Sequence, residues 1–240
     1  MATPTVNNYH IVVAAGSGSR FGAQMPKQFC LLAGRPMLMT TLERLTLCAP
    51  DARVIVVLHP DMMEPWRQMC EEYSFRVPHT VVGGGDTRAR SVQNALLTLD
   101  AARVGWVSVH DAARPLVTPD MMQRLIDAIA SGASGAIPVV PVTDSLRLVG
   151  PDGTSRAVDR SLYRAVQTPQ LFDGPALIAA YDRELLPTFT DEAAVMEAAG
   201  HTSLAITEGH PACFKVTSPG DLERAEAMLK TLWTACETLT

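Results

Sequence analysis

The sequence IVVAAGSGSRFGAQMPKQ occupies residues 11–28 and joins an apolar run to a glycine-rich loop. Its first three residues are apolar and β-branched, which is typical of a strand buried in a parallel sheet. Gly16 and Gly18 follow directly, and the backbone N–H groups of such a loop can surround phosphate oxygens. Because ligands of open α/β sheets bind beyond the carboxyl ends of the strands, this stretch predicts such a sheet with a binding loop.

The rest of the first 130 residues or so continues the alternation of strand and helix. Apolar runs predict further buried parallel strands at residues 54–58, 81–82 and 106–109. Apolar residues at helical spacing predict helices over 38–45, 92–99 and 122–129. This order predicts an α/β fold with a doubly wound, mostly parallel, Rossmann-like sheet whose crossovers are right-handed.

The pattern changes after Ala136. Pro138 and Pro141 interrupt the run Ile137–Val142, and prolines are rare inside a central strand because they lack an N–H donor. We therefore expect residues 137–167 to form an arm that projects from the sheet of a single domain spanning residues 1–240. The remaining elements are expected as helices around 175–186 and 191–199, strands at 204–206 and 214–216, and a last helix from residue 219.

Composition excludes several classes of protein. The chain has 240 residues, of which 47% are hydrophobic and 19% charged, so it is neither disordered nor strongly charged. Its formal net charge of −5 gives no overall attraction to nucleic acid or to an anionic membrane. No apolar run approaches the roughly 20 residues of a membrane span. We expect a protein that binds neither nucleic acid nor membranes.

The cysteines point to a reducing compartment. There are five, an odd number, and none belongs to a C-x-x-C pair. This usage suggests neither a disulfide framework nor a zinc ribbon. A cytoplasmic location is the expectation.

The glycine-rich loop does not match the two best-known phosphate-binding patterns. A dinucleotide fingerprint needs a third glycine where Phe21 stands, and the second strand ends at His59 without an acidic residue for a ribose. A Walker A loop needs a final G-K-[ST], which is absent. A third possibility is a triphosphate loop in which Arg20 and Lys27 supply cations. A surface turn with two solvated charges is the alternative.

Two later segments carry further chemistry. Gly85 ends a glycine run, and Asp86 and Ser91 then offer an acceptor and a hydroxyl, although Asp86 could equally cap the next helix. Asp111 follows a central strand, where its carboxylate would suit a hard cation such as Mg²⁺. Arg114 is either a cation for a second substrate or a salt-bridge partner. His110 lacks companion zinc ligands, which favours a packing or hydrogen-bonding role.

Residues 14–28 resemble the pattern A-A-G-x-G-x-R followed by P-K-Q, the signature of nucleotidyltransferases with a nucleotide-diphospho-sugar transferase fold. More narrowly, the chain resembles the 4-diphosphocytidyl-2-C-methyl-D-erythritol synthase family. That narrower resemblance covers nearly the whole chain. It rests on ordered blocks: G-G-D-T-R at 84–88 with Ser91 and Val92, H-D-A-A-R-P at 110–115, V-D-R at 158–160, T-P-Q at 168–170, T-D-E at 190–192 and K-V-T at 215–217.

The resemblance implies transfer of a cytidylyl group from CTP to 2-C-methyl-D-erythritol 4-phosphate, with release of pyrophosphate, in non-mevalonate isoprenoid synthesis. It also implies Mg²⁺ as cofactor and a homodimer in which the arm of one subunit completes the site of the other. The implied catalytic residues are Arg20, Lys27 and Lys215, with Asp111 as metal ligand. The implied nucleotide-binding residues are Ala14, Ala15, Gly16, Gly18, Gly85, Asp86, Ser91 and Ala112. The implied polyol-phosphate-binding residues are Arg114, Ser145, Arg160 and Thr190.

Some positions depart from the family pattern or have a simpler reading. Val13 replaces a common proline, Ser145 a usual threonine and Cys213 a usual asparagine. Arg160 also fits a solvated arm residue, and Thr190 fits a helix N-cap. Two other functions stay open: cytidylyl transfer to another polyol phosphate, such as ribitol 5-phosphate, and a non-catalytic nucleotide-binding regulator.

Overall fold

The computed structural model describes residues 6–16 and 25–237. In this part of the chain, an eight-stranded sheet runs in the order β10, β7, β11, β6, β1, β4, β5, and β12 also pairs with β7. Its strands are β1 (Asn7–Ala14), β4 (Arg53–Leu58), β5 (Thr80–Gly83), β6 (Val104–Asp111), β7 (Gly135–Pro141), β10 (Arg164–Val166), β11 (Gln170–Asp173) and β12 (Leu204–Glu208). The α-helices are α1 (Met37–Cys48), α2 (Met63–Glu72), α3 (Arg88–Leu96), α4 (Pro119–Ala130), α5 (Gly174–Ala180), α6 (Glu192–Ala198) and α7 (Pro219–Glu237).

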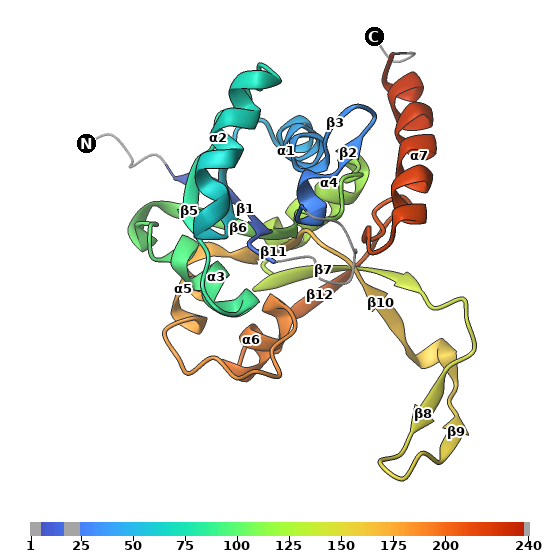
Figure 1. Cartoon of the computed structure of the whole chain (residues 1–240). Helices are drawn as coiled ribbons and strands as arrows, with labels where there is room; N and C mark the ends of the chain where they lie inside the picture. Colours follow the sequence, from blue (N-terminus) through green and yellow to red (C-terminus); the bar gives the residue numbers. More distant parts are fainter. Residues whose placement is uncertain (1–5, 17–24, 238–240) are drawn as a thin grey trace.

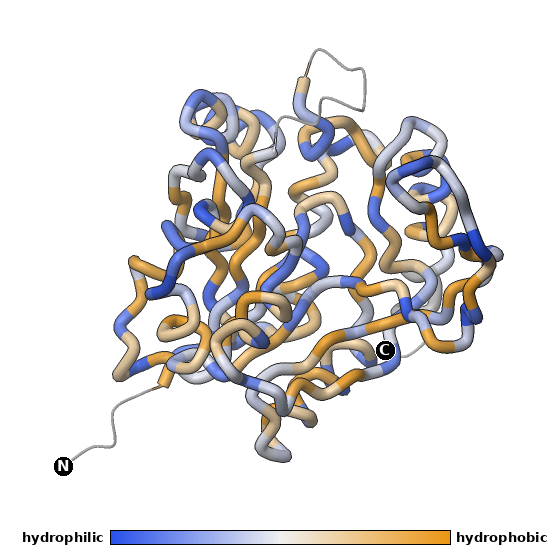
Figure 2. The backbone as a smooth tube through the Cα atoms, turned by 90° about the horizontal axis from the view of Figure 1, so that it is seen from below, coloured by the Kyte–Doolittle hydropathy of each residue, from blue (hydrophilic) through white to orange (hydrophobic). Residues whose placement is uncertain are grey.

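Alternate residues of the central strands bury opposite faces of the sheet. Val12 and Val56 pack with α1 and α4, whereas Ile11 and Val57 pack with α3 and α5. Successive side chains of a strand point to opposite faces, so a sheet covered on both sides needs continuous apolar runs. Figure 1 shows the sheet with helices on both sides, and Figure 2 shows hydrophobic stretches alternating with hydrophilic ones along the chain.

The predicted doubly wound α/β fold is confirmed. β1 runs parallel to both β4 and β6, and β4 runs parallel to β5. Two elements were not predicted from the sequence. One is the antiparallel strand β11, which lies between β6 and β7 and has only four residues. The other is α2, where Pro65 stands in the first turn and Trp66 is the buried residue among its ten. The strand expected at 214–216 does not form.

The expectation that residues 137–141 lie outside the main sheet is wrong. They belong to β7, which pairs with β12 along one side and with β11 and β10 along the other. Pro138 is tolerated because its nitrogen points to a place where no strand partner needs a donor. In a strand, the nitrogen and the carbonyl oxygen of one residue point to the same side. The Pro138 carbonyl accepts from Gln167 N at 2.8 Å, so the Pro138 nitrogen also faces the junction between β10 and β11, where the ladder of hydrogen bonds is interrupted.

The arm that leaves the sheet is therefore shorter than expected. It comprises residues 142–163, and its end is an antiparallel pair of β8 (Arg147–Val149) with β9 (Ser155–Ala157). All six residues of this pair are exposed. Figure 1 shows the pair projecting away from the rest of the molecule.

No helix among the described residues is both long enough and apolar enough to cross a membrane.

Candidate functional site

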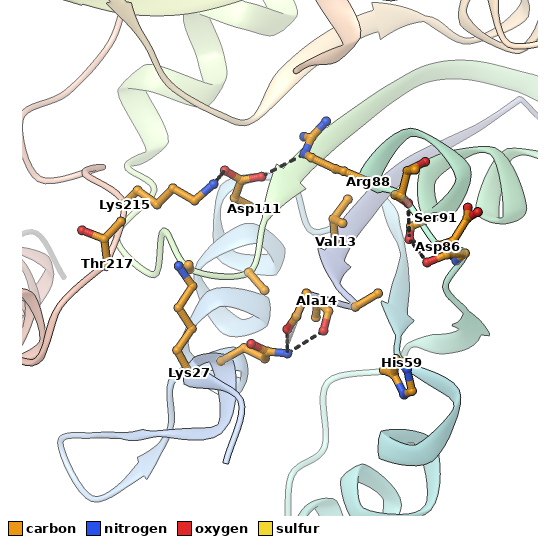
Figure 3. A pocket seen from close by; sticks show the side chains of 17 residues that line it. Val13, Ala14, Lys27, His59, Asp86, Arg88, Ser91, Asp111, Lys215 and Thr217 are labelled. Carbon is orange, nitrogen blue, oxygen red and sulfur yellow. Dashed lines mark hydrogen bonds and ion pairs between the residues drawn. The ribbon is translucent and has the colours of Figure 1, made fainter. Parts of the chain in front are cut away.

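A pocket of about 690 Å³ lies where β1, β4, β5 and β6 end. This volume suits a small-molecule ligand. The predicted site residues that line it are Ala14, Ala15, Gly16, Lys27, Gly85, Asp86, Ser91, Asp111, Ala112 and Lys215. Figure 3 shows Lys27 and Lys215 on one side of the pocket, with His59, Asp86 and Ser91 on the other. Arg20 and Gly18 lie outside the described residues.

Asp111 carries the charge at the centre of this pocket. Its Oδ2 lies 2.8 Å from Lys215 Nζ, and its Oδ1 lies 3.4 Å from Arg88 Nε. Burial alone would raise the pKa of Asp111, but the charges of Arg88 and Lys215 outweigh it and hold that pKa well below its usual range. Asp111 is therefore a permanent carboxylate at neutral pH.

Arg88 also lines the pocket, although no role was predicted for it within the G-G-D-T-R block. Its guanidinium donates to both oxygens of Glu192, at 2.6 and 3.0 Å. Glu192 is fully buried and also accepts from the Tyr181 hydroxyl at 3.1 Å. A buried carboxylate requires such partners. Arg88 thus connects Asp111 to the start of α6.

Ser91 uses its hydroxyl within its own loop. Its Oγ accepts from Gly85 N at 3.1 Å and donates to Thr87 O at 2.9 Å. Gly84 packs so closely that a Cβ there would lie 2.5 Å from the Ala15 side chain. The loop after β5 and the end of β1 therefore form one continuous wall of the pocket. Asp86 is exposed on that wall.

His110 orients the backbone at the end of β6. Its Nε2 lies 2.9 Å from Arg114 O and its Nδ1 lies 3.0 Å from Thr168 Oγ1, which also accepts from Asp111 N. Burial lowers the pKa of His110 to about 4, so the ring is neutral. The hydrogen-bonding role predicted for His110 agrees with this geometry. No cluster of three or more His, Cys, Asp or Glu side chains suited to a metal occurs among residues 6–16 and 25–237.

Arg114 lies behind Asp111 and does not line the pocket. It donates to Cys213 O at 3.0 Å and to Val166 O at 3.3 Å, and its Nε lies 3.6 Å from Asp111 Oδ2. Of the two interpretations of Arg114, the salt-bridge partner is the one that this geometry shows. Cys213 is buried, and its thiol donates to Thr168 O at 3.2 Å. Burial raises the pKa of this thiol to about 12.

The structure does not bring Ser145, Arg160 or Thr190 into the pocket. Ser145 and Arg160 belong to the exposed arm, where Arg160 donates to the Thr143 carbonyl. Thr190 is exposed and does not cap α6, because the N-cap is Asp191, which accepts from Ala194 N at 3.0 Å.

Comparisons with known proteins identify the family of the chain. The 2-C-methyl-D-erythritol 4-phosphate cytidylyltransferase family matches residues 9–231. A protein of that name from Bacteroides fragilis is 39% identical over 91% of this chain and 98% of its own length. A solved structure of that name from Thermus thermophilus has a TM-score of 0.72 at 31% identity, covering 93% of this chain and 99% of that one.

A second solved structure, the bifunctional IspDF of Campylobacter jejuni, has a TM-score of 0.74 at 28% identity. The match covers 91% of this chain and 54% of that protein. The chain thus spans about half of a bifunctional relative and nearly all of the single-function relatives above. On the strength of the family match and the identities, the chain belongs to the 2-C-methyl-D-erythritol 4-phosphate cytidylyltransferase family.

Proposed function

We propose that this protein transfers the cytidylyl group of CTP to 2-C-methyl-D-erythritol 4-phosphate and releases pyrophosphate. The observation that carries the proposal is the pocket itself: two lysines and an ionised aspartate line it together with Ala14, Ala15 and Gly16 at the end of β1. Cations at such a position can hold a triphosphate and the phosphate of an acceptor together. Family membership supports the identity of both substrates.

The reaction needs positioning and charge stabilisation rather than a general base. The acceptor phosphate monoester is already anionic at neutral pH, so its oxygen attacks the α-phosphorus directly and pyrophosphate leaves. Lys27 and Lys215 would both stabilise charge on the triphosphate from the same side of the pocket. Asp111 holds Lys215 at 2.8 Å and so fixes the direction of that ammonium group.

Mg²⁺ fits this pocket only together with the nucleotide. Asp111 supplies one ionised carboxylate, and Mg²⁺ in nucleotide enzymes is commonly held by one or two carboxylates plus phosphate oxygens and water. Asp111 would therefore hold the ion jointly with the triphosphate. When bound, the ion would neutralise part of the triphosphate charge.

Replacing Asp111 by asparagine is expected to raise the Mg²⁺ concentration needed for half-maximal activity by roughly tenfold or more, because a neutral amide is a weaker ligand for a hard cation. The measurement is a Mg²⁺ titration at saturating CTP. An Asp86→Asn variant is the matched control within the same pocket. An unchanged titration for Asp111→Asn would show that Asp111 serves only to orient Lys215 and Arg88.

The substrates are tested by measuring pyrophosphate release from CTP or UTP with a panel of polyol phosphates. We expect turnover with CTP and 2-C-methyl-D-erythritol 4-phosphate and much slower turnover with ribitol 5-phosphate. UTP should be poor, because its O4 would face an acceptor where the cytosine amino group donates. Equal use of CTP and UTP would contradict the proposed base pocket at Gly85 and Asp86, and preference for ribitol 5-phosphate would reassign the acceptor.

The proposal includes a homodimer. The arm projects from the protomer and carries exposed apolar side chains, with Leu162 80% and Val149 65% exposed. Such groups are commonly covered by a partner. A two-fold dimer in which each arm reaches the other subunit would bring Arg160 and Ser145 to a pocket. The cytoplasmic location stays a prediction from cysteine usage.

A further inference from the structure

Gln28 lies beside Lys27 in the P-K-Q block, yet neither the family resemblance nor the proposed reaction gives it a role. Its side chain is buried, with 4% of the residue exposed. The side-chain amide nitrogen donates to Ala14 O at 2.6 Å and to Gly16 O at 3.1 Å. An amide NH₂ group has two hydrogens, so both are used on the backbone at the start of the glycine-rich loop.

These two bonds join the two ends of the loop. The chain leaves β1 at Ala14 and returns at a short 3₁₀ turn over Lys27–Phe29. That turn is itself fixed, because Phe29 is buried in the core beside α1 and Cys30 N donates to Lys27 O at 3.0 Å. Gln28 therefore holds the Ala14 and Gly16 carbonyls against the fixed Lys27–Phe29 turn.

The bonds also keep two backbone carbonyl groups from turning toward a bound nucleotide. The Ala14 and Gly16 carbonyls accept from Gln28, and a carbonyl that turned toward a bound triphosphate would repel its oxygens. Lys27 belongs to the same turn, and its Nζ donates to Val216 O at 3.0 Å, next to Lys215. One buried amide thus sets the backbone at the pocket wall and the position of a proposed catalytic cation.

We propose that Gln28 is a positioning residue for the nucleotide: it holds the Ala14–Gly16 backbone and Lys27 in the arrangement that binds the triphosphate. The proposal rests on the function proposed above and concerns the same pocket. Gln28 lines the pocket wall, and in this scheme it acts through the loop and through Lys27.

Two substitutions separate the donor role from simple packing. Gln28→Met keeps much of the volume and removes both donors, whereas Gln28→Glu keeps the shape and places an acceptor against two carbonyls. We expect the KM for CTP to rise roughly tenfold in Gln28→Met and further in Gln28→Glu, since each takes the side-chain donor from the buried Ala14 carbonyl and from the Gly16 carbonyl. The KM for the polyol phosphate should change little. Gln68→Met on the exposed face of α2 is the matched control and should match the unmodified protein.

A double-mutant cycle with Lys27→Ala tests whether Gln28 acts through that lysine. We expect Gln28→Met to lower kcat in the unmodified protein and to lower it little further in the Lys27→Ala protein, because coupled residues are not additive. Fully additive effects, or equal rises in both KM values, would overturn the proposal in favour of a general structural role. Unchanged CTP kinetics in Gln28→Met would overturn it as well.

CTP affinity measured by calorimetry provides a readout that does not depend on turnover. If the unmodified protein binds CTP but transfers no cytidylyl group, the proposed function fails while the Gln28 proposal is still decided by the loss of affinity in Gln28→Met. Should Gln28→Met fail to fold by near-ultraviolet circular dichroism, Gln28→Glu decides: retained fold with unchanged CTP affinity overturns the proposal, and retained fold with weakened affinity supports it.

Discussion

A Lys27→Ala protein is expected to lose roughly 10²-fold or more in kcat, with a smaller loss of CTP affinity. Lys27 lines the pocket, and its ammonium group donates a hydrogen bond to Val216 O at 3.0 Å, next to Lys215. Charge grows on the α-phosphate and on the leaving pyrophosphate in the transition state, so a preorganised cation contributes most there. The same result is expected for Arg20→Ala from the sequence alone.

The measurement is steady-state pyrophosphate release, with kcat and both KM values determined separately. Lys230→Ala is a matched control, because Lys230 is an exposed lysine of α7 that does not line the pocket. Near-normal turnover of the Lys27→Ala protein would remove Lys27 from the catalytic groups. A rise in the KM for CTP with unchanged kcat would make it a ground-state binding residue only.

The sequence predicted the strands whose burial is a local property. The run at 54–58 is buried on both faces of the sheet, so it is apolar throughout and its composition alone indicates a strand. The prediction that Pro138 lies outside the sheet was wrong because the cost of a missing N–H depends on what lies opposite it. Here the gap between β10 and β11 lies opposite Pro138, and no local sequence pattern indicates that gap.

Some residues of the candidate site could likewise be predicted from local sequence, and one could not. Lys27 and Asp111 could be assigned because one adjoins the glycine-rich loop and the other ends a strand, and all parallel strands of the sheet end at one edge. The role of Arg88 could not be assigned, because its main partner, Glu192, lies 104 residues further along the chain. The burial of Glu192 depends on α5 and α6 packing against the sheet, which is a property of the tertiary fold.

The predicted dimer leads to the second large effect: two inactive proteins should restore activity when mixed. Within one protomer, Arg160 does not line the pocket that holds Lys27 and Asp111. If it completes the site of the partner, each site consists of Lys27 from one subunit and Arg160 from the other. Lys27→Ala and Arg160→Ala homodimers should then both be nearly inactive, each for a different reason.

Subunit exchange between these proteins produces heterodimers in which both substitutions fall in one site and the other site is intact. With random reassortment of equal amounts, about half of the dimers are mixed and each has one working site, so roughly a quarter of the unmodified activity should return. Native mass spectrometry measures the heterodimer fraction, and a mixture of Lys27→Ala with Lys215→Ala is the control that should stay inactive, since both residues line the same pocket. If heterodimers form and no activity returns, Arg160 serves its own subunit or no site, and the arm joins the subunits without taking part in the reaction.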